Sequence, residues 1–168
     1  FATTTIASAS AMLTWVFFDR LNGRKVSALG ACIGAVVGLV VITPSAGFVT
    51  IPQSMFFGFI GAIVSNKMVY WKKLKQIDDT LDVFACHGVG GIMGMILTAI
   101  FAQGENASLL HGGFSVFGHH MMALVLVSVF TFGGSYLLFK LTNLIIPIRV
   151  SEESEDIGLD LSQHGEKF

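Results

Sequence analysis

The sequence predicts an all-α fold, a bundle of membrane-spanning helices, and three observations predict it. Of the 168 residues, 53% are apolar and only 12% are charged, which is about half the charge of a typical soluble domain. The mean hydropathy is +0.73. Apolar runs long enough to cross roughly 30 Å of hydrocarbon recur along the chain, and in lipid a helix satisfies the backbone polar groups of such a run.

Five runs are long enough to span a membrane, and they cover residues 1–18, 26–43, 52–71, 81–102 and 119–150. The first opens at Phe1 without a starting Met or a charged leader, so we interpret it as a truncated span rather than a signal peptide. The last is longer than a bilayer requires, so we expect it to tilt or to project as helix beyond the membrane. Residues 151–168 form a separate tail.

The basic residues are segregated along the chain. All ten Lys and Arg residues fall near the first turn, near the end of the third run, or at the end of the fifth run and in the tail. The connections 44–51 and 103–118 contain none. The positive-inside rule therefore predicts a multi-pass protein of the plasma (cell inner) membrane whose tail, including Lys167, is cytoplasmic.

Small residues at helical spacing predict that helices of this bundle approach one another closely. The glycines in question are Gly30, Gly34, Gly38, Gly58, Gly61, Gly88, Gly91 and Gly94. The sequence has no basic cluster with interleaved aromatic residues, so it gives no indication of nucleic-acid binding. Cys32 and Cys86 lack metal-ligand spacing and are expected to be free thiols, so we expect neither a metal nor a cofactor.

His87 is the strongest candidate for a functional residue. An ionisable side chain within hydrocarbon is costly unless it faces a partner or a polar pathway. His87 lies five residues into the fourth run, about 7–8 Å deeper than Asp82, and its imidazole can donate to or accept from a small polar solute. A hydrogen-bonded packing role is the alternative. Thr43 precedes a proline at the end of the second run, where it lines a pathway or simply ends the helix.

Three stretches resemble the ammonium transporter family (Amt/MEP/Rh). Residues 78–94, Asp-Asp-Thr-Leu-Asp-Val-Phe-Ala-Cys-His-Gly-Val-Gly-Gly-Ile-Met-Gly, are similar to its tenth-helix signature. Residues 29–34 and 41–47 resemble its eighth helix. Gly158-Leu159-Asp160 with His164-Gly165-Glu166 resembles its cytoplasmic tail motif.

The resemblance implies helices seven to eleven and the tail of an eleven-helix inverted-repeat fold, usually a homotrimer. It implies transport of ammonium or ammonia through a narrow apolar pore, and no enzymatic activity. His87 would be the second member of a pore histidine pair, Thr43 a pore-side hydroxyl, and Asp82 and Val83 positions at the inner exit. The residues implied to be regulatory are Gly158, Asp160, Ser162, His164, Gly165 and Glu166, of which Ser162 resembles a hydroxyl that is phosphorylated in plant relatives.

The implied partners are the lipid bilayer and a PII-type regulator at the cytoplasmic face. We expect the acidic tail to dock on the basic turns around Arg20 and Lys72, because their charge is opposite to that of the tail. An ammonium-sensing membrane module and a Rhesus-type channel for ammonia or carbon dioxide are the alternatives. An intramembrane enzyme is disfavoured, because no second catalytic group or metal ligand accompanies His87 at membrane depth.

Overall fold

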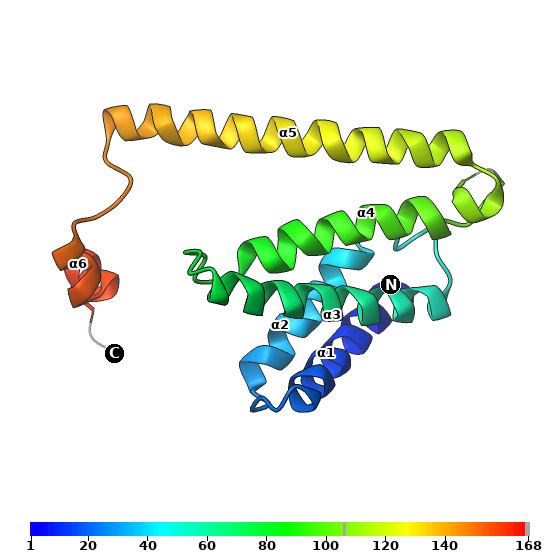
Figure 1. Ribbon diagram of the computed structural model, residues 1–168, viewed down its shortest axis with the longest axis horizontal. Coiled ribbons are helices and arrows are strands. Elements are labelled where there is room, and N and C mark those ends of the chain that lie inside the picture. Colours follow the sequence, from blue (N-terminus) through cyan, green and yellow to red (C-terminus); the bar gives the residue numbers. More distant parts are fainter. Residues whose placement is uncertain (106, 167–168) are drawn as a thin grey trace. The chain divides into compact units, whose positions relative to one another are not determined.

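The computed structural model describes residues 1–105 and 107–166, and every regular element within them is a helix (Figure 1). The all-α prediction is therefore confirmed. Contacts divide the chain into two units, Phe1–Leu124 and Val125–Phe168. The first unit holds α1 (Ala2–Leu21), α2 (Ala28–Ile42), α3 (Ile51–Leu74), the π-helical turn η1 (Phe84–Val89), α4 (Gly90–Phe101) and the 3-10 turn η2 (Leu109–His111). Helix α5 (Phe114–Ile145) crosses the division, and the second unit adds α6 (Glu152–Ile157) and the π-helical turn η3 (Asp160–His164).

Among the described residues, two helical segments are long and apolar enough to cross a membrane by length and composition. They are Phe84–Phe101, which combines η1 with α4, and the 32 residues of α5. Helix α2 is apolar but has 15 residues. Helices α1 and α3 have 20 and 24 residues, and both carry basic side chains in their last turns.

Local signals set the helix ends, which differ by a few residues from the ends of the apolar runs. Ser27 accepts a hydrogen bond from the Gly30 amide at the start of α2 (3.0 Å), as an N-cap residue does. Helix α5 starts at Phe114 rather than at residue 119, two residues after Gly112, whose φ of +80° ends the preceding turn. It ends at Ile145 rather than at residue 150, because Pro147 disfavours helix in the residue before it.

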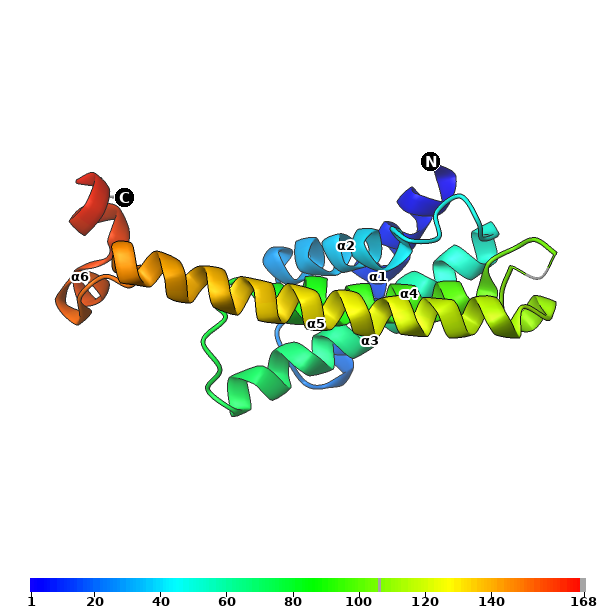
Figure 2. The same cartoon turned by 90° about the horizontal axis from the view of Figure 1, so that it is seen from above.

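Close backbone approach holds the first unit together. Helix α1 packs against both α2 and α3, and α4 packs against α2 and α3 (Figure 2). A Cβ atom at Gly38 or Gly58 would collide with the carbonyl oxygen of Ala7, so only glycine allows α1 to lie this close. Gly94 packs similarly on α2, whereas Gly91 has no neighbour within 4 Å. The predicted glycine faces are thus confirmed on α2 and α3, and in part on α4.

Candidate functional site

His87 lies in the π-helical turn η1 at the start of the fourth helical run. The turn packs against α2 and α3 through its buried residues Ala85, Cys86 and Val89. His87 is exposed, so its imidazole lies on the face turned away from this packing. The π-helical conformation is rare and frequently marks functional sites.

The position of His87 in its helix differs from the predicted one. The helical turn begins at Phe84, so His87 belongs to the first turn and does not lie five residues inside the run. Asp82 precedes the turn and has a φ of +55°, a left-handed conformation that a regular helix does not contain. Asp82 therefore lies in the loop that leads into the helix.

Asp82 does not face the exposed side on which His87 lies. It is only 9% exposed, and its Oδ1 atom lies 2.5 Å from the ammonium nitrogen of Lys72. Val83, the next residue, is half exposed. Of the residues predicted for the inner exit, the structure thus brings Val83 to the same exposed side as His87 and turns Asp82 toward Lys72.

Lys72 and Asp79 are further candidates for the site, although sequence reasoning considered Lys72 only for docking of the tail and did not single out Asp79. Lys72 Nζ lies 3.3 Å from Asp79 Oδ2 and also donates to the Asp79 carbonyl oxygen. Lys72, Asp79 and Asp82 together form what we call the Lys72 cluster. The sequence signal for this cluster is a lysine in the last turn of a helix that is followed within ten residues by three aspartates, two of which bind it.

Asp79 also caps the helical turn that carries His87. Its Oδ1 accepts from the Val83 amide (2.9 Å) and its Oδ2 from the Phe84 amide (3.0 Å). Burial raises the pKa of the Asp79 carboxyl, but the hydrogen bonds from the Phe84 and Val83 amides and from Lys72 outweigh burial and lower this pKa below its usual value.

Thr43 lies at a different height from His87 along the axis of α4. It directly follows α2, is exposed, and donates its hydroxyl to the Leu39 carbonyl (2.7 Å). A Cβ atom at Gly94 would lie 3.2 Å from Pro44 Cγ, so Thr43 is near the level of Gly94. Gly94 follows His87 by two helical turns, or about 10 Å along the helix axis.

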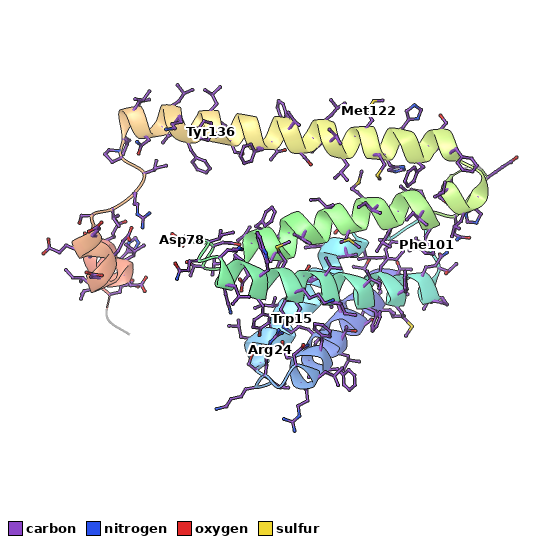
Figure 3. All side chains as sticks on the ribbon, in the orientation of Figure 1. Trp15, Arg24, Asp78, Phe101, Met122 and Tyr136 are labelled. Carbon is purple, nitrogen blue, oxygen red and sulfur yellow. The ribbon has the colours of Figure 1, made fainter. Side chains whose placement is uncertain are left out.

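A second charged network joins α1 to α3. Asp19 is only 5% exposed and accepts from Arg24 (3.1 Å) and from Asn66 Nδ2 (3.0 Å). The Arg24 guanidinium lies 3.1 Å from the centre of the Tyr70 ring. This network and the Lys72 cluster place the turn after α1 and the loop after α3 toward the same end of the unit. Figure 3 shows Asp78, which lies in that loop, at the other end of the unit from Phe101.

The tail folds on itself in the described residues. Arg149 pairs with Glu155 through two hydrogen bonds of 2.7 and 3.0 Å, and the Arg149 hydrogen bond lowers the pKa of the Glu155 carboxyl. Ser162 Oγ donates to the Ser154 carbonyl (3.2 Å). Gly158 and Gly165 have φ of +97° and +71°, which favours glycine at both positions. Asp160 and His164 bound the π-helical turn η3; Lys167 lies outside the described residues.

Lys72 is not the tail-docking residue that we expected. It is 4% exposed and engaged by two aspartates, so its charge is not available to the acidic tail. Arg20 is exposed, as are Lys73 and Lys75. The basic surface at this end of the first unit therefore includes these side chains and not Lys72.

The described residues contain no group of three or more His, Cys, Asp or Glu side chains that could hold a metal ion. Cys32 and Cys86 are free thiols, as expected.

Closely packed helices, segments of spanning length and an exposed imidazole at the start of one of them define a polytopic membrane helix bundle. The family model "Ammonium Transporter Family" matches residues 1–168, the whole chain. The chain therefore belongs to the ammonium transporter family.

Individual relatives agree with this assignment. The chain is 39% identical over 173 residues to the "Ammonium transporter" of Bacillus subtilis, covering 99% of this chain and 43% of that protein. It is 38% identical to "Ammonium transporter 1" of Schizosaccharomyces pombe, with 97% and 35% covered. The crystal structure of Candida albicans Mep2 superposes with a TM-score of 0.83 at 34% identity, with 96% and 38% covered. The chain thus spans less than half the length of these relatives.

A structure described as "Sensor Amt Protein" is also similar. It superposes with a TM-score of 0.83 at 29% identity, and the match covers 96% of this chain and 40% of that one. The same fold therefore occurs in a protein described as a sensor.

Proposed function

We propose that this chain forms the C-terminal part of a membrane pathway for ammonium or ammonia, with His87 in contact with the solute. The observation that carries the proposal is the exposed imidazole of His87 on a turn whose other face is packed against α2 and α3. A polar ring at membrane depth persists only with a partner or a polar pathway. Membership of the ammonium transporter family supports the choice of solute.

The chemistry of the imidazole suits this solute. A bare ammonium ion in an apolar pore loses its hydration at a severe cost. A neutral imidazole offers one donor and one acceptor nitrogen, so it can replace part of that hydration and relay a proton. The family resemblance implies a second histidine from outside this chain, and the two rings would form the pair in the middle of the pathway.

The other site residues take supporting roles in this proposal. Val83 is the apolar lining next to His87 on the inner side, and the Thr43 hydroxyl lines the pathway about 10 Å further along the helix. Asp82 is buried against Lys72 and acts on the solute through its charge rather than by direct contact. The Lys72 cluster holds two carboxylates and one ammonium, so its net negative charge favours cations at this mouth.

We further infer that the end carrying the Lys72 cluster faces the cytoplasm, because the basic residues gather there. In a homotrimer, each subunit would have its own pathway. The tail residues Gly158–Glu166 would dock on the exposed basic side chains around Arg20 and regulate transport, with Ser162 as a phosphorylation site, and a PII-type regulator would bind the same face. Loss of regulation after deletion of residues 151–168 is the expected result.

The test is replacement of His87 in the full-length protein reconstituted into liposomes. We expect His87→Ala to abolish ammonium-evoked current while the protein remains folded, and His87→Glu to conduct K⁺, because a fixed charge replaces a neutral ring. Methylammonium uptake is measured in parallel. His119→Ala is the matched control, since this exposed histidine lies on α5, and should transport normally. Unchanged current and selectivity in His87→Ala would show that His87 is a packing residue.

A sensing function is the second candidate, and the similarity to the sensor Amt protein favours it. A sensor would bind ammonium and change the state of a partner without net flux. Saturable binding by the reconstituted protein, with no current and no methylammonium uptake, would support the sensor. Carbon dioxide flux in the same liposomes would instead indicate a Rhesus-type channel.

A further inference from the structure

Lys72 is a buried lysine with an unusual environment. It lies in the last turn of α3 with 4% exposure, although lysine is almost never fully buried without a partner. Its ammonium meets the Asp82 carboxylate at 2.5 Å and the Asp79 carboxylate at 3.3 Å. Removing an ammonium from water costs several kcal/mol, which only well-placed carboxylates offset. The geometry of the cluster is therefore closely constrained.

Both aspartates of the cluster hydrogen-bond into the turn that carries His87. Asp79 accepts from the Val83 and Phe84 amides through its carboxylate. The Asp82 carbonyl accepts from the Cys86 amide (2.9 Å), and Cys86 precedes His87. A short chain of contacts therefore runs from the end of α3 to the backbone beside the imidazole, through the side chain of Asp79 and through the side chain and backbone carbonyl of Asp82.

The turn needs such support because its conformation is not the intrinsically favoured one. It is π-helical over Phe84–Val89, and such turns are rare compared with α-helical ones. Asp82, in the loop that leads into it, has a φ of +55°, a left-handed conformation that is unfavourable for a non-glycine residue. Without a restraint, the loop and the turn would relax toward other conformations.

We propose that Lys72 is a positioning residue for the pathway: by binding Asp79 and Asp82 it fixes the turn that carries His87. This inference rests on the proposed role of His87. It assigns to Lys72 no contact with the solute. It predicts that loss of the Lys72 charge changes where the imidazole lies, and hence which solutes pass, in protein that is still folded.

Four variants test this inference in the full-length protein. Lys72→Met nearly keeps the length of the side chain and removes the charge. Lys72→Met/Asp82→Asn also removes one carboxylate, so it avoids leaving two unpaired negative charges and protects folding while the restraint is still lost. Lys72→Arg keeps the charge. Lys67→Met is the matched control, because this exposed lysine lies on the same helix.

Two quantities are measured, and neither would change if Lys72 only kept the protein folded. The first is the ratio of methylammonium to ammonium transport, together with the KM of each, per folded molecule in liposomes. A loss of folded protein scales both rates equally and leaves the ratio unchanged. The second is the rate at which a thiol reagent labels His87→Cys in protein without Cys32 and Cys86, which does not depend on transport.

We expect the ratio and the labelling rate to change roughly three- to thirty-fold in Lys72→Met and in the double variant, the range of coupling changes that single mutations produce. Lys72→Arg should restore most of the wild-type ratio, and Lys67→Met should match wild type. Unchanged ratio and labelling in both charge-removing variants would overturn the inference. If wild-type protein transports neither ion, the proposed function fails, and the labelling rates alone decide whether Lys72 positions residue 87.

Discussion

Asn66 donates a hydrogen bond of 3.0 Å to the carboxylate of Asp19, and this contact joins α3 to the end of α1. Arg24, from the turn that follows α1, donates to both of these side chains, to Asp19 at 3.1 Å and to Asn66 at 2.8 Å. Three segments of the chain therefore meet in one closed set of hydrogen bonds. The apolar composition around it gives little indication of such a network.

Replacement of Asp19 should destabilise the protein. Asp19→Ala leaves Arg24 and Asn66 without their shared acceptor, and hydrogen bonds to a charged group contribute roughly 1.5–3 kcal/mol. Since Arg24 is partly exposed to water, we expect a loss near the lower end, about 1.5 kcal/mol. Thermal unfolding in detergent measures it. Asp78→Ala, at an exposed position of the same end, serves as control, and equal melting temperatures for the two variants would contradict the prediction.

Gly58 should not tolerate even a methyl group. A Cβ atom there would collide with the carbonyl oxygen of Ala7 and lie 3.1 Å from the Ala11 amide nitrogen, so α1 has to move away. Overpacking of this kind typically costs about 1–3 kcal/mol. We expect Gly58→Ala to lower the unfolding temperature, whereas Gly47→Ala, with no neighbour within 4 Å, should leave it unchanged. A stable Gly58→Ala protein would mean that α1 and α3 separate easily.

The Asp79 carboxyl should make the stability depend on pH. Its pKa is lower in the folded protein than the usual 3.8, so its stabilising contribution is present above that value and is lost as the pH falls through the folded pKa. The difference in unfolding temperature between wild type and Asp79→Asn should therefore be largest near neutral pH and shrink below pH 3.8. Asp78→Asn, at an exposed position, provides the control. A difference that is independent of pH would contradict the assignment.

The orientation can be tested by cysteine labelling of intact cells in protein without its native cysteines. We expect Leu110→Cys to react with a membrane-impermeant reagent from outside and Asp78→Cys to react only after the cells are opened. Both positions are exposed. Ser108, an obvious choice from sequence, is buried and bonded to the His111 ring (3.0 Å), so it is a poor probe. Labelling of both positions from the same side would exclude the proposed topology.

The helices were predictable from the sequence because hydropathy and length determine them in an apolar chain. Each of the five apolar runs contains a helix in the structure. The boundaries were less predictable, since composition continues across the points where local signals act. Pro147 is one such signal, because the run of apolar residues continues past it to Val150 while the helix does not.

The details of the site were less predictable than the helices. The exposure of His87 follows from its place in an apolar run, but the π-helical turn depends on hydrogen-bond register, which residue identity does not reveal. The pairing of Lys72 with Asp79 and Asp82 depends on how the loop after α3 folds back. Charge patterning suggested an exposed Lys72, and the family resemblance implied Asp82 at the inner exit; neither indicated that the two side chains are buried against each other.

The π-helical turn has a consequence for the length of this segment. Such a turn contains one residue more than an α-helical turn. Deleting a single residue other than His87 from Phe84–Val89 should therefore yield an α-helical turn and leave the segments before and after it in nearly the same relative orientation, because the wider turn takes up the extra residue. Deleting a residue within α4 would instead rotate the two flanking segments by about 100° relative to each other. A one-residue deletion should thus disturb the direction of the chain less in this turn than in α4.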